Sequence, residues 1–238
     1  MKSWLKICTM ILFMVAMPLA ASAAPSRFAK NQCKKEARTN PPKIEVVYNY
    51  GELKIDHTHT AEELAEIMKK MYPSAPENNH KINGLTRLSP YISVESGVVE
   101  KQMGENLCYY PESVKLYIGY KPVVYIREDL PEGTCRYNVT MRHEQTHLDI
   151  GDLSMQQFLQ KIKVIFPRII KEAGVVIKSA DDNVNAVDAS TELNDLYHKR
   201  VSGRFDVFVS EMVNQQIRID TTDSYDFEGS LCPQELQQ

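Results

Sequence analysis

A glycine-poor stretch at 138–173 places the strongest constraint on how this chain can fold. Gly151 is its only glycine, and apolar residues recur every three or four positions, which is the spacing of a buried helical face. We expect one long helix that bends or breaks at Pro167 and ends at Gly174. A second amphipathic stretch opens at 181–183 and runs to about residue 219. Together they predict an antiparallel helical hairpin.

The chain before this hairpin is rich in short β-branched and aromatic runs, which predict strands. These runs, separated by Gly, Pro or Asn, are 43–50, 53–56, 91–95, 98–103, 113–119 and 122–127. Thr60 and Glu63 form a capping-box pattern that predicts a short helix after the second run. We therefore expect an α+β fold in which a small antiparallel sheet packs on the long antiparallel helical hairpin.

The first 23 residues have the pattern of a secretory signal peptide. Lys2 and Lys6 precede an apolar run, and Ala21-Ser22-Ala23 fits a signal-peptidase site. We expect a periplasmic or secreted protein, and no other apolar run is long enough to span a membrane stably. The predicted organisation is a signal peptide at 1–23, a flexible arm at 24–42 and one domain at 43–238, comprising a sheet-rich part (43–136), the hairpin (137–220) and a tail (221–238).

Charge excludes nucleic acid as a partner. Without the signal peptide the chain has 26 basic and 31 acidic side chains, a net charge of −5. Such a balance lacks the basic surface that phosphate backbones require.

Four cysteines remain after the signal peptide, and an even number in an exported chain predicts two disulfides. We expect Cys108 to pair with Cys135 across two strand-like runs, and Cys33 to pair with Cys232. The second bond would tie the new N-terminus to the tail. A thiolate metal site is the alternative, but the chain has no CxxC pair to support it.

The chemically informative motif is His143-Glu144-Gln145-Thr146-His147, an HExxH. On a helix, two histidines four positions apart share one face, so both imidazoles can bind one metal ion. Glu144 lies about 100° away around the helix, where a carboxylate can serve as the general base for a metal-bound water. Zinc suits imidazole ligands and this chemistry. The alternative is a solvated helical face that carries two histidines by chance.

A catalytic zinc site needs a third protein ligand, and the motif does not continue as HxxGxxH. If the hairpin turns near residue 179, the residue opposite His147 is Glu211, and we predict that it is the third ligand. His57 and His59, in a short HTH run, form a less favoured second metal site. Several tyrosines could donate to an oxyanion, and the sequence does not choose among Tyr48, Tyr50, Tyr197 and Tyr225.

The HEQTHLDI run and the YNVTMR segment before it resemble a bacterial domain-of-unknown-function family described as predicted secreted zinc-dependent proteases. The similarity extends to the Cys108–Cys135 strand region and to the run 216–221 before Cys232. It implies a zincin-like fold, with His143 and His147 as zinc ligands and Glu144 as the catalytic base. The expected function is a zinc metallopeptidase acting on peptide or protein substrates. The alternative is a non-catalytic envelope protein that keeps the fold and a structural metal.

Overall fold

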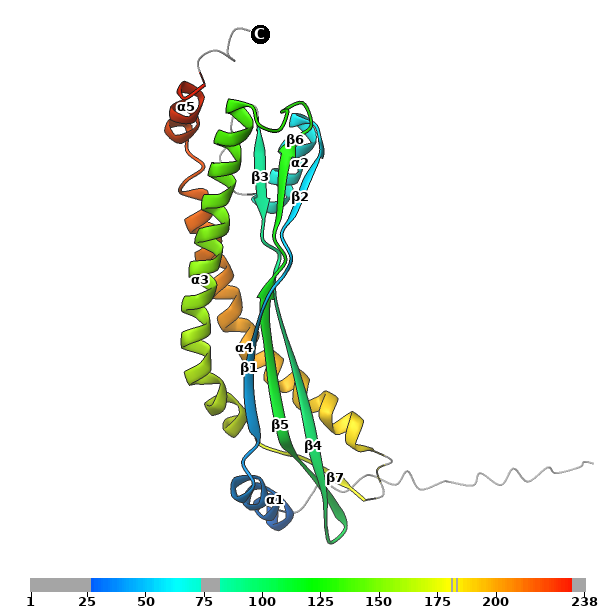
Figure 1. The fold of residues 1–238 in the computed structure, drawn as a ribbon. Helices are drawn as coiled ribbons and strands as arrows, with labels where there is room; N and C mark the ends of the chain where they lie inside the picture. Colours follow the sequence, from blue (N-terminus) through cyan, green and yellow to red (C-terminus); the bar gives the residue numbers. More distant parts are fainter. Residues whose placement is uncertain (1–26, 74–81, 181, 183, 233–238) are drawn as a thin grey trace, which may run out of the picture.

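The computed structural model describes residues 27–73, 82–180, 182 and 184–232, so the predicted signal peptide lies outside the described residues. The described chain is α+β (Figure 1). Its helices are α1 (Arg27–Thr39), α2 (Ala61–Met71), α3 (Cys135–Ala173), α4 (Ala186–Ile217) and α5 (Thr222–Ser230). Its strands are β1 (Lys43–Tyr50), β2 (Lys54–His59), β3 (Gly84–Arg87), β4 (Pro90–Met103), β5 (Asn106–Tyr120), β6 (Val123–Arg127) and β7 (Val176–Ser179).

The strands form two sheets that follow one another end to end (Figure 1). One has the order β1-β5-β4, with β7 pairing the start of β5, and the other has the order β2-β6-β3. Because β1 leads into β2, β3 into β4 and β5 into β6 through two or three residues, the lateral order is kept from sheet to sheet. Both sheets are mixed, since β1 pairs with β5 and β2 with β6 in parallel. Our prediction of a purely antiparallel sheet is therefore wrong.

The long hairpin is present, and local sequence signals set its ends. Thr134 caps α3 by accepting a hydrogen bond from the backbone N–H of Tyr137, and Gly174 ends it in a positive-φ conformation. The helix continues through Pro167 without interruption. Asn185 and Asp188 form a capping box at the start of α4. The predicted capping box of Thr60 and Glu63 also forms, at the start of α2.

The main hydrophobic core lies between the hairpin and the first sheet. Phe158 of α3 stacks on Phe208 of α4, with 4.6 Å between the ring centroids. Leu116 and Ile118 of β5 are fully buried in the same core. Burial of these side chains is the main stabilising term for the hairpin. A smaller core, in which Leu64 of α2 packs on Leu85 of β3, covers the second sheet. The HExxH end of α3 runs beside this second sheet (Figure 1).

The disulfides pair differently from our prediction. Cys33 bonds to Cys108, and Cys135 bonds to Cys232. The predicted Cys33–Cys232 pair is excluded because α1 and α5 lie at opposite ends of the molecule (Figure 1). The predicted Cys108–Cys135 pair is excluded because Cys108 of β5 lies at the α1 end of the molecule, bonded to Cys33, whereas Cys135 starts α3 at the other end (Figure 1). Two disulfides are consistent with an oxidising, extracytoplasmic compartment.

Both terminal segments contain more structure than we predicted. The arm at 24–42 includes α1, which buries Ala29 and Cys33 against the first sheet, and the tail includes α5. Helix α5 escaped prediction because it has no apolar stripe, whereas the stripe of α1 is short and made of the small residues Ala29, Cys33 and Ala37. Among the described residues, no helix is long and apolar enough to cross a membrane.

Candidate metal centre

The two motif histidines converge on a third side chain that we did not predict. The Nε2 atoms of His143 and His147 are 3.1 Å apart. Asp220 Oδ1 lies 3.1 Å from the first and 3.0 Å from the second. These are the only three side chains among the described residues that meet the geometric requirement for a metal site. A zinc ion binds such atoms at about 2.0–2.1 Å, so one ion can contact all three.

Each histidine is oriented by a second hydrogen bond on its other ring nitrogen. His143 Nδ1 lies 2.7 Å from Glu228 Oε1, and His147 Nδ1 contacts Gln216 Oε1. Gln216 also donates its Nε2–H to the backbone oxygen of His147 at 3.0 Å, which leaves its Oε1 to accept from Nδ1. Both rings therefore carry hydrogen on Nδ1 and direct Nε2 toward Asp220. This is the arrangement in which surrounding groups orient metal-ligating histidines.

The charges of the three groups are strongly coupled. Burial alone would lower the pKa of His143, but its hydrogen bonds to Asp220 and Glu228 outweigh burial and raise the pKa to about 10. The pKa of His147 is raised for the same reason, with Asp220 as its main partner. Burial opposes ionisation of Asp220, yet its hydrogen bonds to both histidines hold its pKa well below the usual range. The surroundings thus favour positive charge on the two imidazoles and negative charge on the Asp220 carboxylate. A single bound cation could contact both Nε2 atoms and Asp220 Oδ1 together.

Glu144 lies beside this centre and faces β3. It is only 3% exposed, and Thr86 Oγ1 donates to its Oε2 at 2.8 Å. Burial raises the pKa of Glu144, while His147 and His143 partly oppose the rise. Gly84 makes room for it, because a Cβ there would lie 2.6 Å from Glu144 Oε1. A raised pKa suits a carboxylate that must take up a proton during catalysis.

Two tyrosines border the centre. Tyr225 of α5 donates its hydroxyl to Asp220 Oδ1 at 3.0 Å and stacks on the ring of His143 at 5.4 Å. Tyr72 lies at the end of α2. Burial is the main reason that its pKa rises to about 12, and the negative charges of Asp220 and Glu144 add to the rise. The sequence had not distinguished Tyr225 from Tyr48, which instead donates to Asp152.

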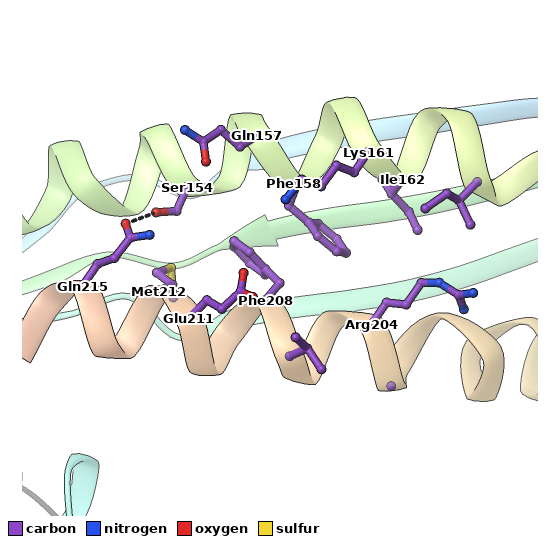
Figure 2. Close-up of a pocket in the computed structure, with 13 residues that line it drawn as sticks. Ser154, Gln157, Phe158, Lys161, Ile162, Arg204, Phe208, Glu211, Met212 and Gln215 are labelled. Carbon is purple, nitrogen blue, oxygen red and sulfur yellow. Dashed lines mark hydrogen bonds between the residues drawn. The ribbon is translucent and has the colours of Figure 1, made fainter.

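Glu211, our predicted third ligand, lies elsewhere. It is exposed on α4 and lines a pocket of about 310 Å³ between α3 and α4, together with Phe158 and Phe208 (Figure 2). The residue opposite His147 is Gln216, five positions further along α4. The error arose from the turn, where β7 and the residues after it lengthen the connection between the helices. In an antiparallel hairpin, moving the turn by a given number of residues moves the α4 residue that faces His147 by twice that number.

The HTH run does not form a second centre among the described residues. His57 packs on the ring of Tyr137 at 5.7 Å, and His59 packs on Tyr125 at 5.3 Å. His59 also lies 3.4 Å from Asp56. These contacts give both histidines a structural role on β2.

Asp220, Gln216, Glu228 and Thr86 are the site residues that sequence reasoning missed, and Tyr225 was one of four tyrosines among which it did not choose. One signal was present, because Gln216 and Asp220 both fall in the run 216–221 on which the family resemblance partly rests. The fold and site thus define an α+β protein with a candidate HExxH–Asp metal centre. Comparisons with protein-family models, with curated proteins and with solved structures gave no match for this chain. The zincin-like affiliation therefore stays a prediction.

A matched pair of substitutions can decide whether Asp220 or Glu211 is the third zinc ligand. We expect Asp220→Ala to weaken zinc binding roughly 10²–10³-fold, because structural zinc sites gain about 10–16 kcal/mol from four ligands. We expect Glu211→Ala to leave the zinc Kd within about threefold. Competition against a chromophoric zinc chelator measures both constants. Weakening in the Glu211 variant, with the Asp220 variant unaffected, would restore the original assignment.

Proposed function

We propose that this protein is an exported zinc-dependent metallopeptidase. His143, His147 and Asp220 hold the zinc, and Glu144 is the general base. The observation that carries the proposal is the meeting of both HExxH histidines with Asp220 at 3.0–3.1 Å, with each Nδ1 engaged by another side chain. A ligand set of two imidazoles and one carboxylate is that of catalytic zinc sites, which keep a fourth position for water or substrate.

When bound, zinc would lower the pKa of water and polarise a substrate carbonyl. Glu144 takes the proton of the attacking water and passes it to the leaving amine. Thr86 fixes its carboxylate through Oε2, and burial keeps its pKa raised so that the proton is accepted readily. Asp220 offsets the cation's charge, and Tyr225 holds Asp220 in place. Peptide bonds are the substrate class that the motif favours.

A metal-stabilised protein without catalysis is the second candidate. It is favoured by burial of the motif, because His143, Glu144 and His147 are each less than 9% exposed. In that case the metal would be held for stability, as in closed zinc sites.

Metal removal tests the proposal. We expect the purified exported protein to cleave an unfolded protein substrate and to lose that activity in 1,10-phenanthroline. Stoichiometric Zn²⁺ should restore it and Mg²⁺ should not, because Mg²⁺ prefers oxygen ligands.

The matched control is 1,7-phenanthroline, which has the same rings but cannot chelate. Activity that survives removal of all bound metal would contradict the proposal. A protein that binds zinc but never cleaves would favour the second candidate.

A further inference from the structure

The Cys135–Cys232 bond, here called the C-terminal disulfide, closes the segment that completes the metal centre. It joins the first residue of α3 to the residue that follows α5 by two positions. Asp220, Tyr225 and Glu228 all lie between the end of α4 and this bond. Each of them contacts His143 or His147. The disulfide therefore encloses every group that the tail adds to the centre.

Helix α5 has little apolar anchorage of its own. None of its nine residues is buried, and Phe227 is 63% exposed. A helix of this length is not stable by itself in water. Its contacts with the centre include polar and aromatic ones: Tyr225 contacts Asp220 and His143, and Glu228 contacts His143. The covalent link therefore adds a restraint at the end of α5 that its own apolar packing does not supply.

The two disulfides differ in access. Cys33, Cys108 and Cys232 are 0%, 1% and 4% exposed, whereas Cys135 is an exposed residue. Thiol–disulfide exchange requires a thiolate to reach one sulfur, so access selects which bond is reduced first. The C-terminal disulfide thus has one cysteine, Cys135, at the surface of the protein, whereas both cysteines of the Cys33–Cys108 bond are buried.

We propose that the C-terminal disulfide is a redox switch of the metal centre, which its reduction weakens by releasing α5. This inference rests on the proposed zinc site. A dithiol reductant attacks the Cys135 sulfur through its thiolate, and Cys232 leaves as a thiolate that takes up a proton. The second thiol of the reductant then displaces Cys135 in the same way. Two electrons pass to the protein, which gains two thiols, and the reductant becomes a disulfide.

Opening this bond weakens the centre without destroying it. Asp220 stays close because it follows α4 by three residues, and Gln216 is part of α4. Glu228 and Tyr225 are lost with α5, so His143 loses the partner of its Nδ1. Loss of such an orienting partner typically costs 10–100-fold in metal affinity. We expect the zinc Kd to rise by about that factor.

Limited reduction followed by a zinc titration tests the switch. The full exported protein is treated with dithiothreitol, alkylated with iodoacetamide and desalted, so that neither reductant nor free thiols compete for zinc. Peptide mass mapping identifies the alkylated cysteines. We expect modification of Cys135 and Cys232 before the other pair, a 10–100-fold higher zinc Kd, and at least tenfold faster amide exchange over 222–230. The Cys135→Ser/Cys232→Ser variant should reproduce both effects without any reductant.

The matched control is Cys33→Ser/Cys108→Ser, which opens the other disulfide and should leave the zinc Kd within about threefold. A Kd unchanged by alkylation at Cys135 and Cys232 overturns the switch while leaving the zinc site intact. Equal reduction of both disulfides overturns the selectivity on which it depends. Failure of the intact protein to bind zinc overturns the proposed function, and the switch with it.

Discussion

Replacing His147 with alanine is expected to raise the zinc Kd about 10³-fold or more. The substitution removes one of three protein ligands and also frees Gln216, whose amide holds both the ring and the backbone oxygen of His147. Each ligand of a structural zinc site accounts for a few kcal/mol, or two to three factors of ten in affinity. Loss of the hydrogen bond by which Gln216 orients the His147 ring lowers the zinc affinity further. Isothermal titration with zinc, after removal of bound metal, measures the change.

The control for this experiment is His198→Ala, which removes an exposed histidine of α4 that is remote in sequence from the motif. Its zinc Kd should match that of the unmodified protein. Since alanine leaves the buried Gln216 oxygen without a donor, at a cost of about 1–3 kcal/mol, folding must be checked by circular dichroism. His147→Gln keeps a polar partner at this place and should still bind zinc weakly. Strong zinc binding by a folded His147 variant would contradict the site.

The hairpin and the helix caps could be predicted because their signals are local. The apolar spacing of 138–173 reflects one helical face, and Thr60 with Glu63 forms a cap within a single turn. The strand 43–50 was predicted with the observed bounds because it has no competing helical pattern. Strands 91–95 and 98–103 are one strand in the structure, with a register shift at Gly97. The glycine marked an irregularity, not an end.

Pairings over long distances could not be predicted in the same way. The disulfide pattern depends on which end of the molecule α1 and α5 occupy, and no periodicity encodes that. The third ligand depends on helix register, which the residues between α3 and α4 determine. The HExxH pair needed neither kind of information, because four residues of one helix fix its geometry. Its histidines were therefore found from the sequence, while Asp220 and the hydrogen-bond partners were not.

Glu144→Gln is expected to lower kcat about 10²–10⁴-fold, the usual contribution of a general base, while the zinc Kd stays within about threefold. The amide has nearly the same shape as the carboxylate, and its oxygen can still accept the hydrogen bond from Thr86. It cannot accept a proton from water at neutral pH, so binding and chemistry are separated. Steady-state hydrolysis of an unfolded protein substrate, with zinc content measured on the same sample, gives both quantities.

The matched control is Glu211→Gln, the same substitution at an exposed position of α4 that lines the pocket in Figure 2. It should leave kcat and zinc content unchanged, so that loss of a carboxylate alone does not account for the effect. Thr86→Val removes the hydroxyl that positions Glu144 and should lower kcat by a smaller factor, because the base itself remains. Full activity in a zinc-loaded Glu144→Gln protein would exclude Glu144 as the base and leave the centre a structural one.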